Sequence, residues 1–175
     1  MYFTDGKFGL TADRVREVLN YDKDTGIFTW RVTLSQRRLA GQACGELKPS
    51  GYVVIGIDGH RYRAHRLAWL YVHGEWPSMQ IDHRDLNRSN NKFDNLRLST
   101  QQQNTFNTPV SKNNRCGFKG VYEHKGRSGL LSRWCAKINV GRRQIHLGTF
   151  DTPEEASRAY EAGARLYAGE FARAA

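Results

Sequence analysis

The sequence has few cysteines, no long apolar run and a shortage of acidic residues. Its three cysteines, Cys44, Cys116 and Cys135, are far apart and form no CxxC pair. Their odd number and wide spacing argue against a disulfide scaffold and a thiolate zinc site, so we expect no structural zinc. The N-terminus lacks an apolar signal core, and no run reaches the length of a transmembrane helix. We therefore expect no membrane association and a protein that works in a reducing cytoplasm.

The shortage of acidic residues is concentrated in one part of the chain. The sequence holds 27 Lys and Arg against 17 Asp and Glu, which gives a net charge of +10. Residues 111–148 alone contain nine basic residues and one acidic residue. Such a local excess is typical of a surface that binds a polyanion, rather than of a general solubilising coat.

Hydrophobic periodicity and turn residues predict mixed helices and strands in the first hundred residues. Thr11 is a helix cap, and Asp58-Gly59 between two β-rich runs indicates a hairpin. Gln103 is placed for a capping box with Thr100 or Ser99 as the cap. The expected helices cover residues 11–20, 65–73 and 101–107, and the expected strands cover 27–30, 51–57, 60–64, 79–83 and 96–99. Residues 31–50 and 84–94 are predicted to be loops.

The last third of the chain predicts a separate, smaller unit. Residues 105–116 lack periodicity and contain Pro109, so this stretch is the best linker candidate. Thr152 is a helix cap followed by a proline at the first helical position. The expected elements are three strands, at residues 119–123, 133–140 and 144–150, and one helix that begins at residue 153.

One cluster of side chains, Asp82, His83, Asn95 and Asn104, is suited to phosphodiester hydrolysis. This reaction needs a base to activate water and a cation to hold the phosphate and offset charge on the departing oxygen. A neutral imidazole supplies a base near pH 7. A carboxylate and an amide oxygen are hard ligands that suit Mg²⁺ or Mn²⁺. Because Asp82 and His83 are neighbours on a predicted strand, both can serve one site only if the strand ends or bends there.

The pattern resembles the HNH, or ββα-metal, nuclease family, and it is closest to the phage-borne and homing-type subgroup. The matching segments are HRLAW (65–69), IDH (81–83), NN (90–91), DNLRLST (94–100) and QQQN (101–104). The resemblance implies that His83 is the general base, that Asp82 and Asn104 hold one divalent metal, and that Asn95 pins the loop and orients His83. If the chain is encoded by a phage, its compartment would be the cytoplasm of a bacterial host.

Several residues near this cluster have a simpler structural interpretation. Asn90 and Asn91 are ordinary turn formers, which we interpret as loop residues. His65 begins an apolar helix and is interpreted as a hydrogen-bonded helix terminus. Four arginines are candidates either for phosphate contacts or for solvated surface charges: Arg66, Arg84, Arg88 and Arg97.

Residues 117–171 resemble an AP2 domain, a module known from plant transcription factors and also found attached to HNH nucleases. The matching segments are GFKGVY (117–122), RWCAKINV (133–140), HLGTFDTPEEASRAY (146–160) and GEFA (169–172). The resemblance implies a three-stranded antiparallel sheet that lies in the major groove of double-stranded DNA and packs on one helix. The predicted fold is therefore α+β, with a nuclease domain at 1–107, a linker at 108–116 and an AP2-like domain at 117–175.

Alternation along the strands separates the residues that face DNA from those that face the helix. Trp134, Val121, Ile138 and Leu147 are predicted to pack in the core, and Tyr160 is interpreted in the same way. The candidates for DNA contact are Lys119, Tyr122, His124, Arg133, Lys137, Asn139, Arg143, Gln144 and His146.

The sequence therefore favours a metal-dependent DNA endonuclease whose sheet directs it to DNA. A non-catalytic DNA-binding regulator with a degenerate nuclease domain is an alternative, because the charge distribution fits both. An RNA-processing nuclease is a third hypothesis. A monomer is compatible with this organisation.

Overall fold

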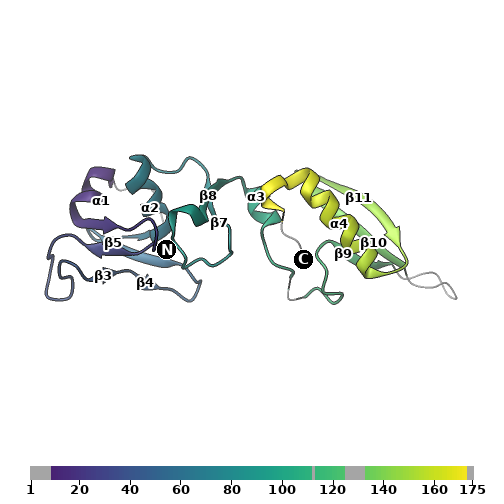
Figure 1. The fold of residues 1–175 in the computed structure, drawn as a ribbon, viewed down its shortest axis with the longest axis horizontal. Coiled ribbons are helices and arrows are strands. Elements are labelled where there is room, and N and C mark those ends of the chain that lie inside the picture. Colours follow the sequence, from purple (N-terminus) through teal and green to yellow (C-terminus); the bar gives the residue numbers. More distant parts are fainter. Residues whose placement is uncertain (1–8, 112, 125–132, 173–175) are drawn as a thin grey trace. The chain divides into compact units, whose positions relative to one another are not determined.

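The computed structural model describes residues 9–111, 113–124 and 133–172. The chain divides into two compact units, residues 1–99 and residues 100–175, and each is described by itself (Figure 1). None of the helices in the described ranges is both long and apolar enough to cross a membrane.

The first unit begins with a capped helix and a small antiparallel sheet. The Thr11 hydroxyl accepts a hydrogen bond from Arg14 N at 3.2 Å, and Val15 and Val18 turn into the core. The helix ends two residues before the predicted Asn20, because the chain turns into a strand that the sequence did not predict. The elements are α1 (Ala12–Val18), β1 (Leu19–Tyr21), β2 (Phe28–Trp30) and β3 (Ala43–Cys44), with sheet order β1-β2-β3.

A second small sheet supports the next helix. Asp58 and Gly59 have φ values of 48° and 78°, as a two-residue hairpin turn requires, which confirms the predicted hairpin. The predicted loop over residues 31–50 was wrong in part, because β3 and a further short strand lie within it and pair with strands on either side of it. The elements are β4 (Glu46–Leu47), β5 (Val53–Ile57), β6 (His60–Arg63) and α2 (Ala64–His73), which ends at Gly74 in the left-handed conformation.

The first unit closes with a two-stranded hairpin, which holds the candidate site. β7 (Gln80–His83) pairs antiparallel with β8 (Leu96–Ser99), and a 3-10 turn, η1 (Phe93–Asn95), precedes β8. Both strands were predicted. Ile81 and Leu96 join a core that also takes in the buried faces of α1, α2 and the two other sheets.

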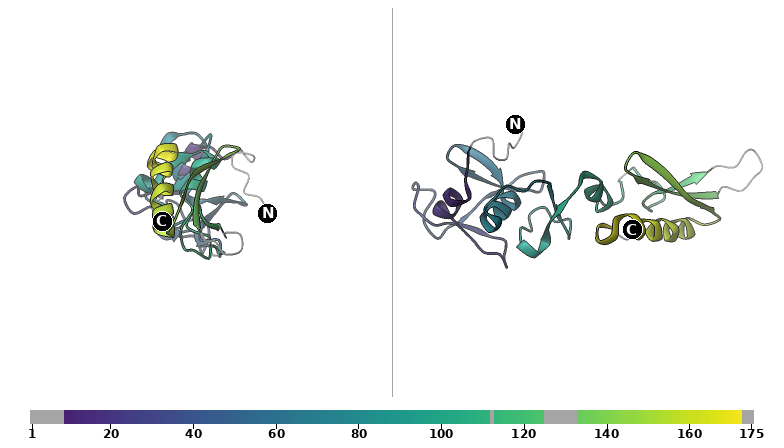
Figure 2. Two further views of the ribbon diagram at one scale, coloured as in Figure 1. Left: turned by 90° about the vertical axis from the view of Figure 1, so that its right-hand side faces the viewer. Right: turned by 90° about the horizontal axis from the view of Figure 1, so that it is seen from above.

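The second unit consists of a short helix followed by a sheet with one long helix. α3 (Gln101–Phe106) begins with the predicted capping box of Thr100 and Gln103. The three predicted strands are β9 (Val121–His124), β10 (Arg133–Val140) and β11 (Arg143–Phe150), in antiparallel order β11-β10-β9. α4 (Pro153–Ala168), capped by Thr152, lies along one face of this sheet in both views (Figures 1 and 2), and η2 (Gly169–Phe171) follows it.

The core between α4 and the sheet contains the residues that the sequence predicted there. Val121, Ile138 and Tyr160 are buried, and Trp134 and Leu147 pack against them at partial exposure. The other faces of β9, β10 and β11 are consequently left uncovered by α4.

Candidate active site

Asp82 and His83 are the last two residues of β7, and both are buried, at 7% and 4% exposure. Their cross-strand partners in β8 are Arg97 and Leu96. The strand ends at His83, where Leu86 N donates a hydrogen bond to His83 O at 3.0 Å. The sequence required such an end if two adjacent side chains were to serve one site.

Arg97 is held against Asp82 inside the hairpin. Its Nε and Nη2 both donate to Asp82 Oδ2, at 3.0 and 2.9 Å, and the two side chains are 8% and 7% exposed. The interpretation of Arg97 as a solvated surface charge was therefore wrong. A buried carboxylate requires a partner, and the facing strand supplies it.

The imidazole of His83 lies against a second histidine and a tyrosine. The ring centroids of His65 and His83 are 5.0 Å apart at 84°, and Tyr52 lies 5.2 Å from His65 and 6.1 Å from His83. Burial lowers the pKa of His83, while the Asn91 side chain and the carboxylates of Asp85 and Asp82 oppose this shift. The net effect keeps His83 neutral at pH 7, which is the form that a general base needs.

His65 lies at the start of α2, as the sequence suggested, and it is buried in the first unit. It is 3% exposed in the first turn of α2. Its Nδ1 atom has no hydrogen-bond partner among the residues that the structure describes. Burial, followed by His83, Arg63 and Arg66, holds its pKa well below the usual range, so the ring beside His83 is uncharged.

Asn95 ties together the two ends of the loop between β7 and β8. Its amide nitrogen donates to Asp85 Oδ1 at 2.9 Å and to Asn90 O at 2.8 Å, while its side-chain oxygen accepts from Asp85 N at 3.1 Å. Its own carbonyl accepts from Arg84 N at 2.9 Å. Burial of Asp85 opposes ionisation, but hydrogen bonds from Asn90, Asn95 and the backbone lower its pKa. The side chain of Asn95, at the end of the loop, therefore holds the start of the loop at Asp85 and its middle at Asn90.

Two more arginines have partners within the first unit. Arg66 donates to Pro77 O at 3.4 Å, and Arg88 donates to Ser50 O at 3.0 Å. The guanidinium of Arg88 also lies over the Tyr52 ring, 4.9 Å from its centroid. Both side chains help to hold the surroundings of the histidine pair.

Asn104, the second predicted metal ligand, lies on α3 in the second unit and is partly buried. The described residues contain no group of three or more His, Cys, Asp and Glu side chains that could hold a metal. The predicted carboxylate ligand, Asp82, lies in the first unit. A carboxylate oxygen and an amide oxygen are each hard donors of the kind that Mg²⁺ or Mn²⁺ accepts.

In the second unit, strand register defines the face opposite α4. Cross-strand partners Tyr122 with Cys135, Lys137 with His146, and Asn139 with Gln144 share a side of the sheet. A register shift after Ala136 brings Thr149 opposite Cys135. This open face holds Tyr122, His124, Arg133, Cys135, Lys137, Asn139, Gln144, His146 and Thr149.

The open face is hollowed and polar. A groove of about 490 Å³ is lined by Tyr122, Glu123, His124, Cys135, Lys137, Gln144, His146 and Thr149. Within it Thr149 Oγ1 lies 3.2 Å from His146 Nε2 and 3.5 Å from Cys135 Sγ. The sequence analysis missed Cys135 and Thr149. Alternation from Arg133 to Lys137 would have found Cys135, but the register shift that exposes Thr149 has no local signal.

Two residues that the sequence predicted to contact DNA, Lys119 and Arg143, do not lie on the open face. Lys119 Nζ donates to the carbonyl oxygens of Thr105, Phe106 and Thr108, at 3.1, 2.7 and 2.7 Å, at the end of α3. Arg143 is the cross-strand partner of Val140, which packs toward α4 rather than on the open face.

Comparison with known proteins identifies the family. Residues 62–106, which include Asp82, His83, Asn95 and Asn104, match the family model described as HNH endonuclease. Protein 3.8 of Escherichia phage T7 is 31% identical over 112 residues, which covers 63% of this chain and 88% of the phage protein. The chain belongs to the HNH endonuclease family. The predicted family resemblance over the nuclease part is thereby confirmed.

Other similar proteins extend over different parts of this HNH chain. An uncharacterized HNH endonuclease, L560, of Acanthamoeba polyphaga mimivirus is 32% identical over 128 residues, or 72% of the chain, and the chain spans 63% of its length. The solved HNH homing endonuclease I-HmuI is 26% identical over 50% of the chain and 49% of its own, with a TM-score of 0.38. An Arabidopsis thaliana ethylene-responsive transcription factor, ERF084, is 48% identical over 59 residues, which covers 33% of the chain and 21% of the plant protein.

Proposed function

We propose that this HNH chain is a metal-dependent endonuclease that hydrolyses phosphodiester bonds of double-stranded DNA. The observation that carries the proposal is the buried, neutral His83 at the end of β7, next to Asp82, within the segment that matches the family model. A neutral imidazole beside a hard carboxylate is the pairing that metal-assisted attack of water on phosphate requires.

Each residue of the candidate site has a role in this proposal. His83 takes the proton from the attacking water, and its burial keeps it unprotonated at neutral pH. Asp82 and Asn104 would hold one Mg²⁺ or Mn²⁺ ion, which when bound offsets charge on the phosphate and the departing oxygen. Asn95 fixes the loop that follows His83 through its bonds to Asp85 and Asn90.

The second unit would direct the enzyme to DNA as an AP2-like module. The similarity to a plant transcription factor supports this assignment, as do the three-stranded sheet on one helix and the basic excess of residues 111–148. We propose that the open face enters the major groove, which admits a β-ribbon, and that Arg133 and Lys137 contact phosphates or guanine edges.

The domain organisation in this proposal has a nuclease domain at 1–107, a linker at 108–116 and the AP2-like domain at 117–175. Residue 112 of the linker lies outside the described residues. The compact units divide at residues 99 and 100, so that α3 groups with the sheet unit, although the HNH match continues to residue 106.

Plasmid cleavage tests the proposed activity. Supercoiled plasmid is incubated with the purified chain in Mg²⁺, in Mn²⁺ and in EDTA, alongside His83→Ala and a control, His60→Ala, on β6. We expect metal-stimulated nicked or linear product from the unsubstituted chain and from the control, and none from His83→Ala. Undiminished cutting by His83→Ala would disprove the assignment of the base.

Measurements of DNA binding and of competition by RNA, made beside the cleavage assay, distinguish the alternatives. Tight DNA binding without metal-stimulated cleavage would identify a DNA-binding regulator instead. Preferential competition by duplex RNA over duplex DNA would identify an RNA-processing nuclease.

A further inference from the structure

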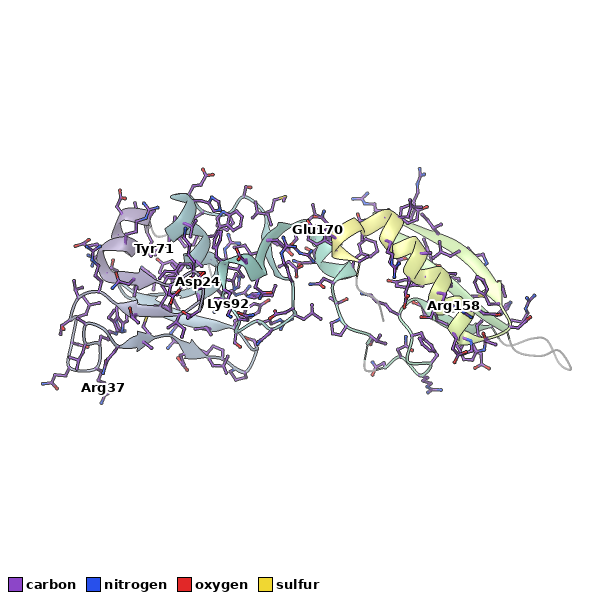
Figure 3. The ribbon with its side chains drawn as sticks, in the orientation of Figure 1. Asp24, Arg37, Tyr71, Lys92, Arg158 and Glu170 are labelled. Carbon is purple, nitrogen blue, oxygen red and sulfur yellow. The ribbon has the colours of Figure 1, made fainter. Side chains whose placement is uncertain are left out.

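The turn between β1 and β2 contacts the loop that follows His83. The Tyr21 hydroxyl donates to Asn91 O at 2.6 Å, and Phe93 N donates to Lys23 O at 2.9 Å. At Gly26 the backbone of the loop comes so close that a Cβ atom would lie 2.4 Å from Asn91 C and from Lys92 N. Figure 3 labels Asp24 of the turn and Lys92 of the loop. Residues 21–26 therefore contact residues 91–93 at three points.

The turn is rigid enough to serve as a support. The Asp22 carboxylate accepts hydrogen bonds from Asp24 N at 2.9 Å and Thr25 N at 3.2 Å, and Gly26 N donates to Asp22 O at 2.9 Å. Tyr21 stacks on Phe28 of the paired strand, with ring centroids 4.6 Å apart. The ring that carries this hydroxyl is thereby packed in the core.

On the other side, the contacted loop residue lies against His83. Asn91 is 3% exposed, donates to Ser89 O at 3.1 Å and interacts through its side chain with the His83 imidazole. Its neighbour Asn90 is held by Asn95. The segment is thus fixed from the hairpin by Asn95 and from the N-terminal turn by Tyr21 and Gly26.

We propose that the turn Tyr21–Gly26 is a positioning element for the candidate active site, which acts by holding Asn91 against His83. Tyr21 and Asn91 are positioning residues in this proposal, which rests on the proposed role of His83 as base. The sequence analysis treated Asn91 as an ordinary loop residue. The close approach of two segments 70 positions apart gives them a joint role.

Tyr21→Phe tests the proposal, because it removes one hydroxyl and keeps the stacked ring. The matched control is Tyr71→Phe in the same aromatic cluster, where Tyr71 meets Tyr21 at 5.8 Å and no described hydrogen bond involves its hydroxyl. In metal-free protein we expect amide exchange of residues 89–93 to quicken about fivefold in Tyr21→Phe. The NMR signals of the His83 ring should also shift, and neither change should occur in Tyr71→Phe.

The cleavage assay then tests the consequence for catalysis. For Tyr21→Phe we expect the rate constant at saturating DNA to fall about fivefold, with KM unchanged. Exchange that quickens evenly over the first unit, or an unmoved His83 signal, would overturn the proposal. An unchanged rate constant in a variant with a freed loop would overturn it as well. If the unsubstituted chain does not cleave DNA, the proposed function fails, whereas the exchange and NMR measurements still decide whether Tyr21 positions Asn91 and His83.

A glycine pair provides a second, stronger perturbation. Gly26 and Gly59 have similar φ values of +75° and +78°, but only Gly26 has atoms within reach of an added Cβ. Gly26→Ala should displace residues 91–92 and lower the cleavage rate constant more than Tyr21→Phe does. Gly59→Ala, which carries the same backbone strain in an open turn, should keep the unsubstituted rate constant. Equal losses in the two alanine variants would contradict a role for the contact.

Discussion

At the scale of single residues, Asp82 depends on Arg97 across the hairpin. Both side chains are nearly buried, and the guanidinium makes two bonds to one carboxylate oxygen. Arg97→Gln would remove the guanidinium charge from beside this buried carboxylate. We expect this change to lower the free energy of unfolding by about 3–5 kcal/mol, measured by urea denaturation.

An exposed ion pair provides the control for this prediction. Arg14 Nε lies 2.9 Å from Asp58 Oδ2, but the two side chains are 37% and 50% exposed. Arg14→Gln should therefore change the stability much less than Arg97→Gln. Equal losses of unfolding free energy from the two variants would show that burial does not make the Arg97–Asp82 pair more stabilising than an exposed pair.

The buried histidines predict how stability depends on pH. Burial lowers the pKa of His65 well below its usual range and lowers that of His83. Once pH falls through about 6.5, the unfolded chain binds protons at these rings that the folded chain does not bind. The free energy of unfolding should therefore decrease as pH falls from about 7 to about 5.

Substitution of His65 tests this pH dependence. His65→Phe keeps a ring beside His83 and removes one titrating group, so it should flatten the decrease measured by urea denaturation at several pH values. Leu67→Met, at a fully buried neighbour on α2, should lower stability by a similar amount at every pH. A His65→Phe slope as steep as that of the unsubstituted chain would contradict the prediction.

Local sequence predicted the candidate residues of the site but not their partners. Asp82, His83 and Asn95 were identified from residue type and spacing, and they lie on or beside the predicted hairpin. The pairing of Arg97 with Asp82 depends on strand register, and the contact of Tyr21 with Asn91 depends on how distant segments pack. No residue type at one position encodes either of them.

At the scale of elements, strong local signals predicted the structure correctly, whereas very short strands were missed. The hairpin at Asp58-Gly59, the capping box of α3 and the capped helix α4 each have their deciding residues within a few positions. The short strands β1, β3 and β4 were missed, because two or three residues carry no periodicity.

The end of α3 predicts a structural role for a lysine that the sequence assigned to DNA. Lys119 Nζ donates to three carbonyl oxygens there, in the last turn of the helix and just beyond it. We expect Lys119→Met to destabilise the second unit by about 1–3 kcal/mol, measured by thermal unfolding, with little change in DNA affinity of the folded protein.

Lys137→Met is the matched variant for this comparison, because Lys137 lies in the groove of the open face. It should weaken DNA binding, measured by fluorescence anisotropy, and leave the unfolding temperature nearly unchanged. The reverse pattern in the two variants would assign Lys119 to DNA and Lys137 to the fold.

At the scale of the whole molecule, the excess of basic residues and the candidate catalytic residues lie in different parts of the chain. Residues 111–148 hold nine basic and one acidic residue, whereas the candidate base and its carboxylate neighbour lie at residues 82–83. If the sheet binds DNA and the hairpin cleaves it, affinity and turnover should respond to separate substitutions.

Salt dependence measures that separation. Each lost phosphate contact lowers the slope of log affinity against log salt concentration by about one, so a double change of Arg133 and Lys137 to Gln should lower it by about two. Arg133 also pairs with the exposed Asp151 at 3.1 Å, so Asp151→Asn serves as a control that removes this partner but keeps the cation. The double variant should cleave at the unsubstituted rate once DNA is saturating, whereas His83→Ala should keep the full salt slope and lose cleavage. A single change that abolished both would mean that binding and chemistry share one surface.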